Sequence, residues 1–184
     1  MPHLSIALLH HPVCNRLGEE ITSTVDHFDV MDGSRLALTY GVYRLFVVNH
    51  LPAQQALVER LIRHGSAASE RDDARGEFAR TRWAPDLAAA IAELTREHGR
   101  APTTLATSAR IGGDAISFAH ARVRLQAGEP MLLLMGKAWG LAPRVLEGAD
   151  LRLQPIDAGT GFNHLSVRSA MAILVDRLLA PAAS

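Results

Sequence analysis

The sequence predicts an α/β protein with a mostly parallel sheet and helices on both faces of that sheet. Short apolar segments alternate almost regularly with longer segments of helical periodicity along the 184 residues. Residues 131–135 contain no polar position, which is typical of a strand covered on both faces, as in a parallel sheet. The length suits one domain with a sizeable core, so we expect residues 1–184 to form a single domain.

Composition places the chain among globular proteins, because 48% of its residues are hydrophobic. No apolar stretch approaches the roughly 20 residues that span a bilayer. The first three residues lack the basic character of a signal peptide. A single cysteine, Cys14, excludes an internal disulfide and suits a reducing compartment. We therefore expect a cytoplasmic protein without a membrane segment.

The formal net charge is zero, with 19 basic and 19 acidic residues. Nucleic-acid-binding proteins often carry a basic excess, so this balance counts against an RNA partner unless basic residues gather in a local patch. Lys137 is the only lysine, and it lies in a loop bracketed by glycines.

The first quarter of the chain predicts two strands with a helix between them. Residues 5–9 predict a buried strand, which Pro12 should end. Residues 15–30 have the polar character of an exposed connection. Residues 32–40 predict a helix that a glycine then stops, and residues 43–49 predict the second strand.

A second helix should begin near Pro52, because proline suits the first turn of a helix. Residues 69–82 carry arginines and acidic residues in equal number. This segment is interpreted as a solvated excursion or, alternatively, as a loop that contacts RNA phosphates. The remaining predicted elements are helices at 85–97 and 118–126, strands at 103–107, 131–135 and 151–156, and a long helix opening within 163–173.

Three acidic residues, Asp26, Asp29 and Asp32, recur at three-residue spacing. They fit the start of a helix, whose positive end favours acidic side chains, or a carboxylate that orients a catalytic group. Adjacent His10 and His11 have no partner motif such as H-E-x-x-H, and a cysteine cluster is absent from the sequence. We therefore expect no metal site.

Two glycine-bearing loops, residues 136–141 and 157–162, each follow a predicted strand. Ligands of open α/β sheets bind at that edge, although ordinary strand–helix connections could look the same. The sequence lacks G-x-G-x-x-G after its first strand and lacks G-x-x-x-x-G-K-[ST]. These absences disfavour a dinucleotide site and an ATPase.

The C-terminal third carries two motifs. They read Leu134-x-Gly136-x-x-Trp139-Gly140-Leu141 and, after Pro155-Ile156, Asn163-His164-Leu165-Ser166-Val167-x-Ser169-Ala170. Both resemble the C-terminal motifs of the SPOUT, or α/β-knot, RNA methyltransferases. The resemblance implies a C-terminal trefoil knot, a rare exception to the rule that chains do not thread. It also implies S-adenosylmethionine (SAM) bound in the knot, and a homodimer that pairs through the knot region.

The resemblance assigns SAM to main-chain and small polar groups of three loops. An Ala-Thr-Ser-Ala-Arg run at 106–110, which recurs in SPOUT relatives, supplies the first loop, and Arg110 is expected to bind substrate phosphate. The implied cofactor-binding residues are Thr107, Ser108, Leu134, Gly136, Trp139, Gly140, Ile156, His164, Leu165, Ser166 and Ser169.

A polar residue, an arginine six positions later and a glycine six after that also match the SPOUT pattern, here as Asp29, Arg35 and Gly41. The ribose-methylating branch has asparagine at the first position, so Asp29 is a departure. The matching position implies that Arg35 positions or helps to deprotonate the methyl acceptor, and that Asp29 holds Arg35 in place. The other interpretation of Arg35 is a solvated helix arginine. Asp157 could act as a base if the target were guanine N1.

Together these features predict a SAM-dependent RNA methyltransferase acting on tRNA or rRNA, at a ribose 2′-hydroxyl or a guanine base. Two alternatives remain open at this stage. One is a SAM-binding regulatory protein without catalytic activity, which the neutral charge favours. The other is a small-molecule enzyme of flavodoxin-like type that uses the same sheet edge.

Overall fold

A parallel sheet organises the molecule. The computed structural model describes residues 3–67, 76–110 and 114–181. Its main sheet has seven strands, all paired in parallel. In spatial order they are β5 (Thr81–Ala84), β4 (Leu45–Val48), β1 (Leu4–Leu9), β8 (Met131–Gly136), β6 (Thr103–Ala106), β9 (Leu151–Leu153) and β7 (Ala115–Ile116). The predicted fold class, an α/β protein with a mostly parallel sheet, is confirmed.

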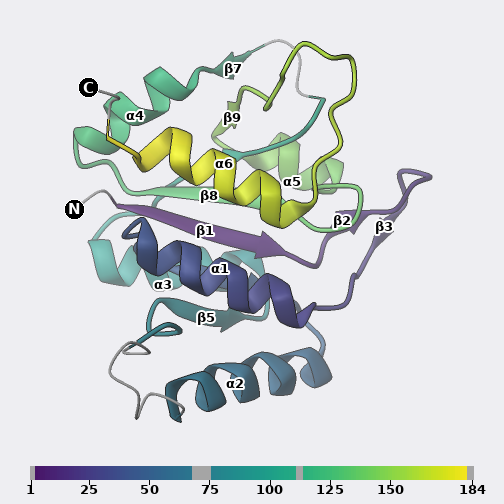
Figure 1. Ribbon diagram of the computed structural model, residues 1–184, viewed down its shortest axis with the longest axis vertical. Helices are drawn as coiled ribbons and strands as arrows, with labels where there is room; N and C mark the ends of the chain where they lie inside the picture. The colour runs from purple at the N-terminus through teal and green to yellow at the C-terminus, as the bar shows by residue number, and fades with distance from the viewer. Residues whose placement is uncertain (1–2, 68–75, 111–113, 182–184) are drawn as a thin grey trace.

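Helices cover both faces of this sheet (Figure 1). One face carries α1 (His27–Thr39), α2 (Pro52–Ala67), α4 (Phe118–Gln126) and α6 (Val167–Leu179). The other carries α3 (Leu87–His98) and the short α5 (Pro143–Gly148). Within the described residues, no helix is both long and apolar enough to cross a membrane.

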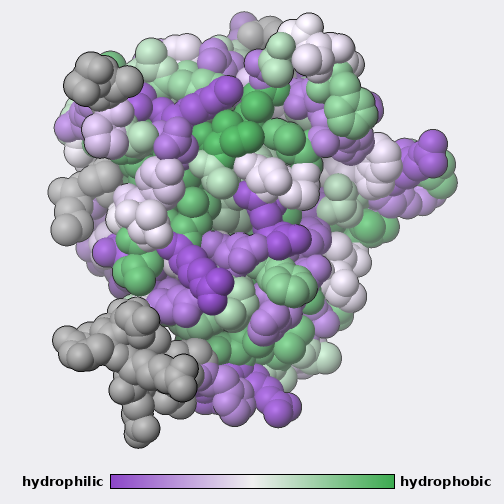
Figure 2. Space-filling view, in the orientation of Figure 1, coloured by the Kyte–Doolittle hydropathy of each residue, from purple (hydrophilic) through white to green (hydrophobic). Residues whose placement is uncertain are grey.

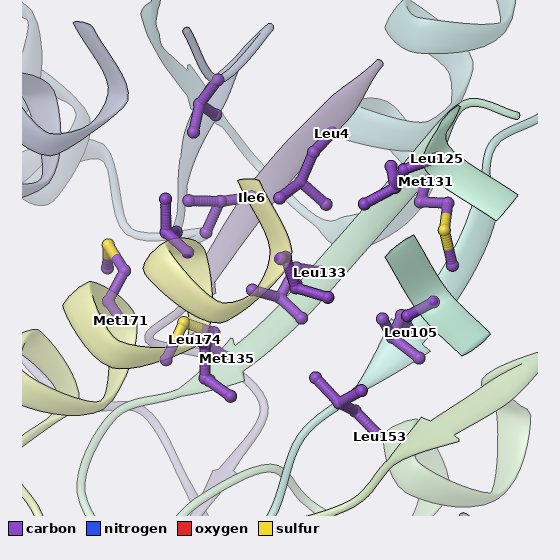
Figure 3. Packing of buried hydrophobic residues seen from close by; sticks show 14 of the residues in the cluster. Leu4, Ile6, Leu105, Leu125, Met131, Leu133, Met135, Leu153, Met171 and Leu174 are labelled. Atoms are coloured by element: carbon purple, nitrogen blue, oxygen red, sulfur yellow. The ribbon is translucent and has the colours of Figure 1, made fainter. Parts of the chain in front are cut away.

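The central strands have apolar side chains on both faces because helices lie on both sides of them. In β1, Leu4, Ile6 and Leu8 face the layer of α1 and α6, whereas Ala7 and Leu9 face the layer of α3. All six residues of β1 are buried. Figure 3 shows the first of these layers, where side chains of β1 and β8 lie close to Met171 and Leu174 of α6. The polar-free run at 131–135 is thus explained by burial on two sides.

Helix α1 begins five residues earlier than expected. Asp26 is its N-cap, and the Asp26 side chain accepts a hydrogen bond from Phe28 N. The expectation that residues 15–30 form an exposed connection is wrong at its end, because Asp29 and Val30 are fully buried. The physical reason is a tertiary ion pair that neutralises Asp29, and local polarity does not reveal such a pair.

Some elements were not expected from the sequence. Strand β5 begins at the end of the charged segment 69–82 and continues to Ala84. Residues 68–75 of that region lie outside the described residues. A two-stranded hairpin, β2 (Val13–Cys14) with β3 (Glu20–Ile21), projects from the sheet edge after β1 (Figure 1). Both the hairpin and β7 are too short to give a periodic signal.

Candidate functional site

Three loops meet where adjacent parallel strands end. They follow β6 (residues 107–110), β8 (residues 137–142) and β9 (residues 154–166), and β8, β6 and β9 are neighbours in the sheet. A pocket of about 550 Å³ lies among them. The predicted site residues that line it are Asp29, Thr107, Ser108, Arg110, Gly136, Trp139, Gly140, Ile156, His164, Leu165 and Ser166.

The remaining predicted site residues lie elsewhere. Leu134 is buried within β8, where its carbonyl accepts hydrogen bonds from Thr107 N at 3.2 Å and Thr107 Oγ1 at 2.9 Å. Ser169 lines a neighbouring groove between α1 and α6. Arg35 is not part of the pocket lining and pairs with Glu77, at 2.6 Å from Nε to Oε1.

The loop after β8 closes tightly upon itself. A Cβ at Gly136 would lie 2.4 Å from Leu141 N and 2.5 Å from the carbonyl carbon of Gly140, so only glycine fits there. The hairpin holds this loop from outside, because Cys14 N donates to Gly140 O at 2.9 Å and Trp139 N donates to Cys14 O at 3.0 Å. Main-chain bonds from a segment near the N-terminus therefore fix one wall of the pocket.

Side chains tie the three loops together. Asn163 Nδ2 donates to Ala109 O at 3.1 Å and joins the third loop to the first. The rings of Trp139 and His164 meet edge to face with centroids 4.9 Å apart, and this contact joins the second loop to the third. Trp139 and Leu165 remain 47% and 43% exposed. Such exposure at a pocket mouth leaves apolar surface available to a ligand.

Asp29 is a buried carboxylate that a lysine, an arginine and a histidine approach from three parts of the chain. Its Oδ2 accepts a hydrogen bond from Lys137 Nζ and lies 3.7 Å from His10 Nε2. Its Oδ1 lies 3.6 Å from Arg168 Nε. Burial raises the pKa of Asp29, but His10 and Lys137 outweigh burial and leave that pKa below its ordinary value of 3.8. Asp29 is therefore an ionised group at the edge of the pocket.

Sequence reasoning missed the partners of this carboxylate and the hairpin. Cys14, Asn15, Arg16 and Gly18 of the hairpin line the pocket. The one signal for Lys137 was its status as the only lysine, placed inside a glycine-bracketed loop. Among the residues that the structure describes, no group of three or more His, Cys, Asp or Glu side chains could hold a metal ion.

Comparison with known proteins gives a family match over almost the whole chain. A family model described as SAM-dependent RNA methyltransferase matches residues 3–180. A protein of Oleidesulfovibrio alaskensis named tRNA (guanine-N(1)-)-methyltransferase is 37% identical over 183 residues, which are 98% of this chain and 43% of that protein. An uncharacterized protein of Aquifex aeolicus is 30% identical over 177 residues, 94% of this chain and 86% of its own length.

Among solved structures, the SpoU methyltransferase AviRb of Streptomyces viridochromogenes, in complex with AdoMet, superposes with a TM-score of 0.61. The two are 14% identical, and the match covers 97% of this chain and 57% of AviRb. At this identity the likeness concerns the fold. The chain spans less than half the length of its methyltransferase relative from Oleidesulfovibrio, whose printed activity describes that whole protein.

Proposed function

Because the chain belongs to the family of SAM-dependent RNA methyltransferases, we propose that it binds SAM in the three-loop pocket and methylates RNA, with tRNA as the favoured substrate. The observation that carries the proposal is the convergence of both C-terminal motifs and the 107–110 loop on one pocket. The name of the Oleidesulfovibrio relative supports tRNA as the substrate.

The pocket suits SAM in size and in chemistry. Its volume of about 550 Å³ falls in the range of small-molecule sites. Ile156, Leu165 and the exposed Trp139 ring offer apolar surface for an adenine. Thr107 and Ser108 offer hydroxyls to the polar parts of the molecule.

SAM supplies an electrophilic methyl group, so the protein has to align the acceptor with that group and allow the acceptor to lose its proton. Arg110 lines the pocket, and its guanidinium suits an RNA phosphate. The implied pairing of Arg35 with Asp29 is not found, because Arg35 binds Glu77 while Asp29 binds Lys137. Asp157 caps a turn, accepting from Gly159 N at 2.7 Å, and lies outside the pocket lining.

The first test uses Trp139 as a reporter. In a Trp83→Phe variant, Trp139 is the remaining tryptophan, and SAM is expected to change its fluorescence with a Kd in the micromolar range. In a Trp139→Phe variant, Trp83 on β5 at the sheet edge should give no change. Equal responses from both variants would contradict the assigned pocket.

Transfer is then measured with labelled SAM and a pool of unmodified tRNA transcripts. Incorporation into tRNA is expected, and nucleoside analysis of the product distinguishes a methylated ribose from a methylated guanine. SAM binding without transfer to any transcript would contradict the tRNA part of the proposal, and an rRNA pool then tests the other RNA class.

The proposal includes the trefoil knot and a cytoplasmic location. Strand β9 follows β8 in the chain but does not pair with it. Instead β9 pairs with β6, on the edge of β6 that faces away from β8, and α6 returns to lie beside α1. These placements support a threaded C-terminal segment. The free, buried thiol of Cys14 supports a reducing compartment.

The proposal also includes a homodimer that covers the groove between α1 and α6. The residues that line this groove include the small Gly33, Ser169 and Ala172, the apolar Leu36 and Met171, and the charged Asp32 and Arg168. Figure 2 shows hydrophobic residues gathered over this side of the molecule beside hydrophilic ones. Such a surface can pair with its own copy across a two-fold axis.

Exposed Ala172 provides the test of the dimer. Ala172→Glu is expected to convert a dimer into a monomer in sedimentation experiments, because it places a charge at the interface. The matched change Ala56→Glu on the exposed face of α2 should leave the mass unchanged. A monomeric unaltered protein would refute the dimer.

A further inference from the structure

The strongest unexplained feature is a cluster of ionisable groups at the edge of the pocket. Asp29 has no solvent exposure, and neither does His10. A carboxylate is costly to remove from water unless partners compensate its charge. Here the compensation comes from Lys137, which lies 108 positions away in sequence.

Lys137 is held at both its main chain and its side chain. Its N donates to Leu9 O at 3.0 Å, and its O accepts from Gly140 N at 3.0 Å. Its ammonium donates to Asp29, and its side chain is 24% exposed. Because an ammonium has three N–H donors, two remain after the bond to Asp29. Lys137 also lines the pocket, so the remaining donors are available to a ligand.

His10 lies against the same carboxylate oxygen. Both ring nitrogens of His10 are buried without a hydrogen-bond partner. A buried polar group left unpaired destabilises a protein and calls for an explanation. The distance of 3.7 Å from Nε2 to Asp29 Oδ2 indicates that the ring packs against the carboxylate and restricts its position.

Two arginines, Arg168 beside Asp29 and Arg35 on the same helix, are less free to act. Arg168 is bound to Asp32 at 2.6 Å, and its guanidinium lies 5.5 Å from the centroid of the Phe28 ring. Arg35 is bound to Glu77 and lies outside the pocket lining. Lys137 therefore combines a fixed position, a pocket-facing charge and unused donors.

We infer that Lys137 is the group that contacts the methyl acceptor, and that Asp29 and His10 are its positioning residues. The inference rests on the proposed function. It transfers to Lys137 the role that the family resemblance gave to Arg35.

In the transfer step, the acceptor atom forms a bond to the methyl carbon as the carbon–sulfur bond breaks, and the bonding electron pair returns to sulfur. The acceptor proton passes to water at the open side of the pocket. As the acceptor loses this proton, negative charge develops on it. The ammonium of Lys137, held in place by Asp29, stabilises that charge by donating a hydrogen bond.

A readout other than activity is available because Lys137 is the only lysine. Labelling with ¹⁵N-lysine gives one Nζ signal in the protein. We expect this signal to move when unmodified tRNA transcripts are added to the complex with S-adenosylhomocysteine. It should also move in Asp29→Asn, which removes the charge that holds the ammonium. If the Nζ chemical shift changes neither on addition of tRNA nor in Asp29→Asn, the inference is wrong.

The kinetic test compares variants at saturating SAM. Lys137→Met is expected to lower kcat by about 100-fold, with Kd for SAM changed by less than about threefold. The kcat of Lys137→Arg should be about tenfold higher than that of Lys137→Met, because arginine returns a hydrogen-bond donor and a positive charge. The control is Arg63→Met, which removes a charge from a side chain 72% exposed on α2 and should leave kcat unchanged.

The outcomes separate the two proposals. Full kcat in Lys137→Met, with SAM still bound, would overturn the role of Lys137 and leave the proposed function standing. Absence of SAM binding by the unaltered protein would overturn the proposed function and this inference together. If Lys137→Met does not fold, then Lys137→Gln and the Nζ signal decide the question.

Discussion

Replacing Gly136 with alanine is expected to destabilise the protein by about 2 kcal/mol and to abolish measurable SAM binding. A Cβ at this position would press on backbone atoms of Gly140 and Leu141, which cannot rotate away as a flexible side chain could. The loop would have to open, and its opening would displace Trp139 and Lys137 from the pocket wall. Urea unfolding and SAM titration measure the two effects.

The matched control is Gly148→Ala in α5. A Cβ at Gly148 meets nothing within 4 Å, so the same chemical change should be neutral or stabilise the fold by up to about 1 kcal/mol. Similar stabilities and SAM affinities for the two variants would show that the tight closure of the loop after β8 is unimportant.

Replacing Asp29 with alanine is expected to lower the free energy of unfolding by about 3 kcal/mol at neutral pH. The change leaves the partly buried ammonium of Lys137 facing a cavity, without the anion that now compensates its charge. The buried ring of His10 would border the same cavity. Asp32→Ala is the control, because it removes a carboxylate from the same helix. The Asp32 side chain is 44% exposed in its pair with Arg168, so the cost should be about 0.5 kcal/mol.

The effect of Asp29→Ala should depend on pH in a defined direction. The folded state holds the pKa of Asp29 below its ordinary value of 3.8. The carboxylate therefore contributes stability above that value, and the contribution is lost as pH falls through the lower, folded-state pKa. The stability difference between the unaltered protein and Asp29→Ala should be constant at pH 5–7 and shrink below about pH 4. A difference that grows on acidification would refute an ionised Asp29.

The sequence predicted those parts of the fold whose signals are local. Strands β1 and β8 are buried on both faces, so their apolar runs were recognisable without any partner. Helix α3 has a cap at Asp86 and a left-handed glycine at Gly99, and its bounds were predicted closely. Strand β5 was missed because Arg82 interrupts a four-residue strand at the sheet edge.

The site was predicted in part for the same physical reason. The loops of the C-terminal motifs are continuous segments, and most of their marked residues do line one pocket. The pair of Asp29 and Lys137 joins segments 108 residues apart, and neither residue type indicates its partner. Polar spacing around Asp29 indicated an exposed segment, whereas the ion pair allows its burial.

The order of strands in the sheet has a consequence for synthesis of the chain. Strand β1 pairs with β4 on one side and with β8 on the other, in a register that sets Leu4 opposite Met131. During translation, β1 can meet β4 early, but its second edge stays unpaired until the 82 residues between β4 and β8, and then β8 itself, have left the ribosome. At about 5–20 residues per second, that interval lasts several seconds. Throughout it, one edge of a mostly apolar strand is open to wrong partners, so nascent chains of this protein should depend on chaperones more than chains that close their central strand early.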